Sequence, residues 1–315
     1  MVNVGVEKLK VLVRGAGDIA SGIIWNLAYA GFNVCCVEVE KPSTIRTEVA
    51  FSSAIYDSEK TLGGVTWMLC KGSHSSPVRS EGLHSSPVRS EDMQSVAEEI
   101  NKCWEEKKVA LIIDPDAKII DEIKFDVVVD AILAKKNLGT RIDMAPLVIG
   151  VGPGFTTGID CHLAIETMRG HNLARIIENG SPMKNTGVPG LIAGHGHDRV
   201  IHSPATGVIH NVHKIGDSVK KDEVIAVIDE ESQCIAPTDK GSHSSPVRDS
   251  VKVLASIDGI LRGIIRDGYN VTKGLKIADI DPRLSEKENC FTISDKARSI
   301  GAAMVTAIMH KLNNC

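Results

Sequence analysis

Hydrophobic positions follow two different patterns along the chain. From Leu9 to about Ile177, short and largely apolar runs alternate with segments of helical period; the runs are LKVLVR, NVCCVEVE, GVTWMLC, VALIID, FDVVVDAIL and APLVIGVG. Strands that are apolar on both faces and separated by helices are typical of a parallel sheet covered on each side. This pattern predicts a doubly wound, Rossmann-like α/β domain over residues 1–180.

The second pattern begins after ENGSPMKNTGVPG, a segment rich in Gly, Pro and Asn that is typical of a linker. The stretch ATGVIHNVHKIGDSVKKDEVIAVID, from Ala205, aligns with IDGILRGIIRDGYNVTKGLKIADID, from Ile257, at a constant offset of 52 residues. Each copy reads as a strand, a glycine turn and a second strand. Two interleaved copies resemble the barrel-sandwich hybrid fold of biotinyl and lipoyl carrier domains, which we predict for residues 194–284.

Carrier domains of this shape present a modified lysine at a tight hairpin between the two halves. The connecting segment here offers Lys240, within TDKG, and this lysine lies too far from the first repeat for a short hairpin. We therefore expect the carrier shape without the carrier chemistry, and a protein-binding use for the domain.

The end of the sequence has the period of a third element. Residues 292–315 carry an apolar stripe with helical spacing, made of Ala297, Ile300, Met304, Val305 and Ile308. Thr292 or Ser294 can cap the helix at its start. We predict a C-terminal helix that packs on the α/β domain.

Composition fits a soluble globular protein with more than one domain. The chain has 315 residues, of which 43% are hydrophobic and 24% charged. Its net charge of -4 provides no basic field for nucleic acid. The sequence MVNVGVEKLKVLV lacks an apolar leader and no membrane-length apolar run occurs, so we predict a cytoplasmic protein without a membrane partner. The eight cysteines form no C-x-x-C pair and are interpreted as small buried hydrophobes.

A hexapeptide, HSSPVR, occurs three times, starting at His74, His84 and His243. Segments rich in Ser and Pro bury too little apolar surface to offset the entropy of ordering them. The three copies are predicted to be dispensable insertions at loop tips; a phosphorylated or partner-binding Ser-Pro site is the alternative.

The stretch RGAGDIASG carries the first candidate chemistry. Gly15 and Gly17 allow a tight turn after a strand, and the helix that follows directs its amides at an anion such as a diphosphate. Ala20 takes the third position of the dinucleotide fingerprint, and an acidic residue at the end of the next strand is expected to bind a ribose hydroxyl. Asp18 places a carboxylate beside the phosphates, which argues against a standard NAD site unless Asp18 serves as an N-cap.

A second glycine-rich turn occurs in IGVGPGFTTGIDCHLAIETMRGH, which we predict to run into a helix. Parallel strands end on one rim, so Gly152 and Gly154 are expected to face the same crevice as the first turn. Helical spacing predicts His162, Glu166 and Arg169 on one face, either as part of a site or as a solvated surface.

The loop AKKNLGTRIDMAP offers basic side chains that either hold an acidic ligand or form surface charge. The histidines of GHGHDRVIH lack a clear third ligand and are interpreted as exposed, so no metal site is predicted. No catalytic residue stands out. The predicted cofactor-binding residues are Gly15, Gly17, Asp18, Ala20, Glu38, Glu40, Arg141, Gly152, Gly154, Asp160, His162 and Arg169.

Several long motifs, among them VRGAGDIASG, DAILAKKNLGTRIDMAPLVIGVGPGFTTGIDCHLAIETMRGH, NTGVPG and TISDKARSIG, resemble one family. It comprises the YqeB-like accessory proteins of selenium-dependent molybdenum hydroxylases. GPGFT and ETMRGH are also similar to the Rossmann part of XdhC/CoxI proteins. The resemblance covers nearly the whole chain outside the HSSPVR copies.

This resemblance implies a maturation role for a molybdenum hydroxylase, with a molybdopterin-type dinucleotide as the bound cofactor. The glycine turns and Glu38 or Glu40 would hold its diphosphate and ribose. The implied partners are the client hydroxylase or another maturation factor, and a homo-oligomer is possible in principle. An NAD(P)-dependent oxidoreductase is the alternative, and the sequence does not decide whether the protein is an enzyme.

Overall fold

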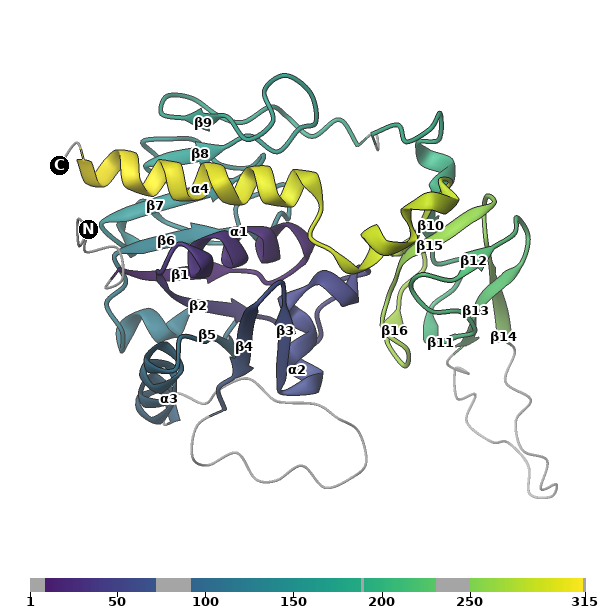
Figure 1. Cartoon of the computed structure of the whole chain (residues 1–315), viewed down its shortest axis with the longest axis horizontal. Coiled ribbons are helices and arrows are strands. Elements are labelled where there is room, and N and C mark those ends of the chain that lie inside the picture. Colours follow the sequence, from purple (N-terminus) through teal and green to yellow (C-terminus); the bar gives the residue numbers. More distant parts are fainter. Residues whose placement is uncertain (1–8, 72–91, 188–189, 231–249, 314–315) are drawn as a thin grey trace, which may run out of the picture. The chain divides into compact units, whose positions relative to one another are not determined.

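The computed structural model describes residues 9–71, 92–187, 190–230 and 250–313. The chain divides into two compact units (Figure 1). Unit 1 comprises Met1–Pro42, Glu48–Gly187 and Thr292–Cys315, and unit 2 comprises Ser43–Thr47 and Val188–Phe291. The HSSPVR copies and Lys240 lie outside the described residues.

Unit 1 is built on a nine-stranded sheet with the order β3-β4-β5-β2-β1-β6-β7-β8-β9. The strands are β1 (Lys10–Arg14), β2 (Asn33–Glu38), β3 (Glu59–Leu62), β4 (Val65–Leu69), β5 (Val109–Ile113), β6 (Val127–Asp130), β7 (Leu147–Val151), β8 (Leu163–Ile165) and β9 (Ile176–Ile177). Strands β4 to β8 pair in parallel within this order, whereas β3 and β9 are antiparallel to their neighbours.

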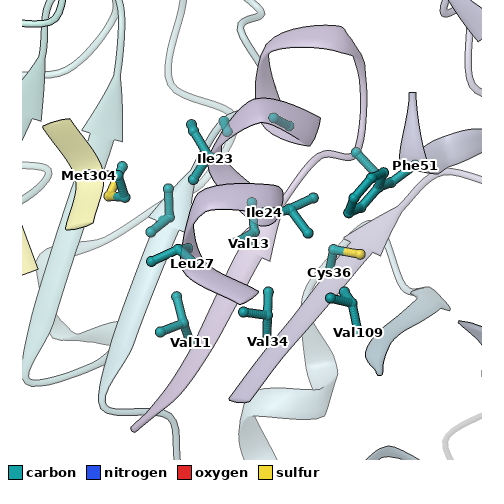
Figure 2. Packing of buried hydrophobic residues seen from close by; sticks show 14 of the residues in the cluster. Val11, Val13, Ile23, Ile24, Leu27, Val34, Cys36, Phe51, Val109 and Met304 are labelled. Carbon is teal, nitrogen blue, oxygen red and sulfur yellow. The ribbon is translucent and has the colours of Figure 1, made fainter. Parts of the chain in front are cut away.

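Helices cover both faces of this sheet, because side chains of a strand alternate between faces. On one face, Val11 and Val13 of β1 pack in the same core as α1 (Asp18–Tyr29) and α4 (Asp295–Asn313), as Figure 2 shows for Leu27 and Met304. On the other face, Leu12 belongs to the core beneath α3 (Met93–Glu105). The short helix α2 (Ala54–Asp57) precedes β3.

Helices α1 and α4 approach each other through two glycines. A Cβ atom at Gly22 of α1 would lie 2.4 Å from the carbonyl oxygen of Ala297, and one at Gly301 of α4 would lie 2.3 Å from the carbonyl oxygen of Gly22. The predicted C-terminal helix is present, with the Ser294 hydroxyl accepting a hydrogen bond from the amide of Ala297 at 3.2 Å. The start of α4 is therefore fixed beside α1.

The predicted doubly wound parallel sheet is wrong, because the sheet is mixed. Strands β3 and β4 form a hairpin whose turn, Gly63–Gly64, has two residues with positive φ, as tight hairpin turns require. At the other edge, the chain passes from β7 through a loop into β8, where a helix was predicted. Both edges of the sheet are thus formed by antiparallel pairs.

Unit 2 contains two four-stranded sheets, β10-β17-β15-β12 and β14-β13-β11-β16. The strands are β10 (Val200–His202), β11 (Gly207–Asn211), β12 (Ser218–Val219), β13 (Val224–Glu230), β14 (Ser250–Leu254), β15 (Gly259–Ile264), β16 (Asn270–Val271) and β17 (Lys276–Asp281). Short 3₁₀ helices occur at Thr47–Val49, Phe51–Ser53, Lys118–Asp121, Ile142–Met144, His197–Arg199 and Leu284–Phe291.

The internal repeat of unit 2 is confirmed by matching hydrogen bonds. The amide of Gly216 donates to the carbonyl of Leu261 at 2.9 Å, and the amide of Gly268 donates to the carbonyl of Ile209 at 2.8 Å. The prediction of a biotinyl- or lipoyl-like barrel-sandwich hybrid is nevertheless wrong. Unit 2 consists of two four-stranded antiparallel sheets, and each copy of the repeat contributes strands to both of them.

Candidate functional site

Four carboxylates lie at the carboxyl ends of the parallel strands of unit 1, which we call the rim. Glu38 ends β2 and Asp130 ends β6, while Asp114 and Glu166 directly follow β5 and β8. Each carboxylate accepts at least one backbone N–H hydrogen bond of 2.7–3.1 Å from the rim loops. Such bonds satisfy donors that would otherwise be buried without partners. These acids therefore fix the conformation of the rim loops.

The first glycine turn is held against the end of β2. Gly15 adopts a φ of 93° and donates its amide to the carbonyl of Val37 at 2.8 Å. The Glu38 carboxylate accepts the amides of Ala16 and Val39, both at 2.8 Å. Burial raises the pKa of Glu38, and these two hydrogen bonds oppose that rise. Glu38 thus contacts the turn, and Glu40 lies two residues further on, half-buried.

The turn leads directly into α1. Gly17 is the N-cap residue, with extended backbone (φ -71°, ψ -174°) and no side-chain hydrogen bond to the helix start. Asp18 is the first helical residue, so the N-capping role considered for it is wrong. Ala20 is buried within α1. The first turn of α1 consequently keeps backbone amides without a side-chain cap at the rim.

Charged side chains from distant parts of the chain gather at this end of α1. Arg169 makes two hydrogen bonds with the Asp295 carboxylate, at 2.9 and 3.1 Å. Burial and the nearby Arg169 guanidinium lower the pKa of Lys296, while the carboxylates of Asp18, Glu166 and Asp295 oppose that shift. These groups act on Lys296 electrostatically and so lie near it. Two cations therefore accompany the first glycine turn.

The second glycine turn has a different environment. Gly152 (φ 83°) and Gly154 (φ 113°) both need a left-handed backbone. A Cβ atom at Gly152 would lie 2.8 Å from the Thr167 hydroxyl oxygen, and one at Gly154 would lie 2.7 Å from the Cα atom of Lys136. The protein chain itself fills the space beside these two glycines. Gly152 and Gly154 are therefore required by packing, whatever ligand is bound.

The predicted helical face of His162, Glu166 and Arg169 is wrong. These residues flank the strand β8, so His162 lies at its amino end and Arg169 beyond its carboxyl end. The His162 Nδ1 atom accepts the amide of Val148 at 2.9 Å, and burial and Lys311 lower the pKa of this histidine. The structure thus places His162 at the amino ends of β7 and β8, at the end of the strands opposite to the rim.

A buried polar network lies under the rim at the end of β1. The Arg14 guanidinium pairs with Asp130 at 3.5 Å and donates to the Thr140 hydroxyl, which in turn donates to Asp130 at 2.5 Å. Asp160 joins this region through Asn137, which donates to it at 3.0 Å. The network ties the loop after β6 to the sheet.

Arg141 does not take part in this network. Its side chain is exposed and pairs with Asp143 at 3.0 Å. Among the twelve predicted residues, the rim therefore brings together the first turn, Asp18, Glu38 and Arg169, and it leaves Arg141 and His162 apart. Sequence reasoning missed Lys296 and Arg14. Arg14 could have been found, because a charged residue that ends an apolar run before a glycine turn stands out in the sequence. Nothing in the sequence around Lys296 indicates that it belongs to the site.

Metal and membrane features were searched over the same described ranges. No group of three or more His, Cys, Asp or Glu residues there is arranged to hold a metal ion. His195 pairs with Asp198, and His197 and His202 are exposed. Within those ranges no helix has the length and apolar character needed to cross a membrane.

Comparison with known sequences gives one informative relative. No family model matches the chain. Over 299 residues, or 95% of its length, the chain is 43% identical to a curated bacterial protein, and this confirms the resemblance to YqeB-like proteins. That relative is "Uncharacterized protein YqeB" of Escherichia coli (strain K12). The chain spans about half of it, 47% of its length.

Comparison with solved structures gives low similarity. A succinylglutamate desuccinylase/aspartoacylase from Rhodobacter sphaeroides matches with 15% identity and a TM-score of 0.25, covering 86% of this chain and 84% of that one. An aspartoacylase family protein from Mesorhizobium loti matches with 11% identity and a TM-score of 0.26, covering 87% and 85%. A succinylglutamate desuccinylase from Silicibacter sp. TM1040 has 12% identity and a TM-score of 0.23, covering 86% and 84%.

These structures carry the names of succinylglutamate desuccinylases and aspartoacylases. None of the three is named as a Rossmann protein, a biotinyl carrier or a molybdenum-cofactor maturation factor. The expectation that the fold of this chain is that of such a factor is corrected accordingly. At these TM-scores the similarity carries no argument about the activity of the chain.

Proposed function

We propose that unit 1 binds a diphosphate-containing nucleotide at the amino end of α1. The observation that carries the proposal is the uncapped start of α1, directly after the turn of Gly15 and Gly17. Amides at a helix start, together with the helix dipole, favour a bound phosphate.

Two neighbouring cations support the same ligand class. Lys296 and Arg169 lie close enough to influence each other electrostatically, and Lys296 also experiences the charge of Asp18 in the first turn of α1. A dianionic phosphate offsets the repulsion between two cations, and charge-assisted hydrogen bonds to phosphate are among the stronger ones in proteins.

Glu38 supplies the acidic residue that a nucleotide site uses beside its glycine turn. Each of its oxygen atoms accepts one backbone amide, and a carboxylate oxygen has lone pairs for a second donor. A ribose hydroxyl can therefore donate to Glu38 without breaking either bond. In this proposal Glu38 both holds the turn and binds the sugar.

The proposal is limited to nucleotide binding. These residues do not distinguish a molybdopterin-type dinucleotide from NAD(P), and the accessory role toward a molybdenum hydroxylase and the partners it implies stay predictions, as does the oxidoreductase alternative. The proposal includes the predicted cytoplasmic location, where cysteines that are free and buried, as in the described structure, are reduced unless an oxidant such as peroxide reaches them.

Calorimetric titration with ADP tests the proposal, since ADP is a small nucleotide that carries a diphosphate. The wild-type chain is expected to bind ADP, and Gly17→Val to bind at least about tenfold more weakly because its methyl groups would occupy the approach of the phosphates. AMP and adenosine serve as matched ligands with fewer phosphates. Equal affinity of the two proteins for ADP, or equal binding of adenosine and ADP, would refute the proposal.

A further inference from the structure

Two buried cysteines of unit 1 lie sulfur to sulfur. Cys70 directly follows β4, Cys103 belongs to α3, and their Sγ atoms are 3.5 Å apart. Both side chains are buried in the core on the α3 face of the sheet. A disulfide requires a separation of about 2.05 Å, so the two sulfur atoms have to approach each other by about 1.5 Å.

Backbone contacts hold this pair in place. The amide of Cys70 donates to the carbonyl of Leu111 at 2.8 Å, which holds Cys70 beside β5. The amide of Lys71 donates to the Glu99 carboxylate at 2.9 Å, which fixes the next residue on α3. The two thiols are consequently near each other because of the fold and not by chance of side-chain rotation.

We propose that Cys70 and Cys103 form a redox modification site at which hydrogen peroxide produces an intramolecular disulfide. The two sulfur atoms lie within hydrogen-bonding distance of each other, and this contact lowers the pKa of Cys103. Lys108 favours the thiolate further, whereas burial and the carboxylates of Glu106 and Glu99 oppose it. Cys103 is therefore the attacking sulfur, because the thiolate is the reactive form.

The reaction proceeds in two balanced steps. The Cys103 thiolate attacks one peroxide oxygen, an S–O bond forms, the O–O bond breaks, and the departing hydroxide takes a proton to become water. The Cys70 sulfur then attacks the sulfenic sulfur of Cys103, the S–S bond forms, and the hydroxyl group leaves as water with the Cys70 proton. Two thiols are oxidised by two electrons in total, and one peroxide is reduced to two waters.

Peroxide treatment of the folded, full-length chain tests the proposal. The expected result is a loss of about 2 Da, the mass of two hydrogen atoms, followed by recovery of a cross-linked tryptic product. Cleavage after Lys60, Lys71, Lys102 and Lys107 gives peptides 61–71 and 103–107, each with a single cysteine. A thiol count on unfolded protein should fall by two from the eight cysteines of the chain.

Matched variants separate this site from other cysteines. Cys70→Ser and Cys103→Ser should each abolish the cross-link, whereas Cys161→Ala, at another buried cysteine, should leave it intact. Absence of the 61–71 to 103–107 product from the wild type overturns the proposal. So does its formation only after unfolding in urea, or sulfinic acid at Cys103 with Cys70 still reduced.

Discussion

The two glycine-rich turns of unit 1 share a sequence pattern and differ in structure. Both follow a buried parallel strand, β1 in one case and β7 in the other. After the first, α1 starts without a side-chain cap. After the second, a loop leads into β8, and the backbone of Lys136 occupies the space beside Gly154. The pattern of glycines alone therefore does not define a phosphate-binding turn; the element that follows and the filling of the space around it do.

The largest expected effect concerns the second turn. Gly154→Ala should lower the free energy of unfolding by about 2–4 kcal/mol, because a Cβ atom there meets the left-handed backbone penalty and overlaps with Lys136. Urea denaturation of unit 1, followed by its tryptophan fluorescence, measures the change. An unfolding midpoint like that of the wild type would contradict the packing role assigned to this glycine.

The next effect concerns the cation at the first turn. Lys296→Met should weaken ADP binding about tenfold, because it removes one charged partner of the phosphate. Lys311→Met, near the other end of α4, is the matched control and should bind ADP as the wild type does. Calorimetry on the three proteins decides the matter, and equal losses in both variants would count against a local role for Lys296.

The same lysine sets the sign of a pH effect. Its pKa is lowered from the ordinary 10.5, so the charged form is disfavoured in the ligand-free fold. A bound phosphate favours the charged form and raises this pKa again, so that binding takes up protons. ADP affinity should therefore fall as the pH rises through the interval between the two pKa values. Titrations in buffers of different ionisation enthalpy detect the uptake, which Lys296→Met should remove.

A smaller effect is expected at Glu38. Glu38→Gln should reduce the free energy of unfolding by about 1 kcal/mol at neutral pH, because the amide side chain can accept only one of the two backbone amides well. Burial raises the pKa of Glu38, so the wild-type free energy of unfolding should decline as the pH rises through the raised value, and at neutral pH this decline offsets part of the hydrogen-bond contribution. The difference between wild type and Glu38→Gln should follow this course; Glu40→Gln should show none of it.

The smallest effect completes the contrast between the turns. Gly17→Ala should change the free energy of unfolding by about 1 kcal/mol or less, because Gly17 has an extended backbone that other residues also adopt. Set beside Gly154→Ala in the same denaturation experiment, it separates a glycine required by packing from one that is not. A loss at Gly17 as large as that at Gly154 would remove the distinction.

Local pattern predicted much of this arrangement. The apolar runs located β1, β2, β4, β5, β6 and β7, and the periodic stripe located α4, because each is determined by burial of its own side chains. The short β3, its antiparallel pairing with β4, and the short β8 were missed. Their direction depends on which neighbour they pair with, and a short apolar run carries no record of its partner.

The candidate site was predictable to a similar extent. The first turn and Glu38 are close in sequence to the strands that position them, and their meeting follows from parallel pairing. Lys296 is distant in sequence, and only the contact between α1 and α4 brings it to the rim. His162 was misplaced because the residues around it were read with a helical period, although they flank a strand.

The glycine contact between α1 and α4 also orders events during synthesis. Gly22 precedes unit 2 in the chain, whereas Gly301 follows the whole of it. A nascent chain that has produced the sheet and α1 still lacks Lys296 and Asp295. The ribosome must therefore finish the strands of unit 2 before the start of α1 receives these two charged residues. A chain that stops before α4 would leave Gly22 without the contact that Ala297 makes with it, and α1 would lack Lys296 at its start.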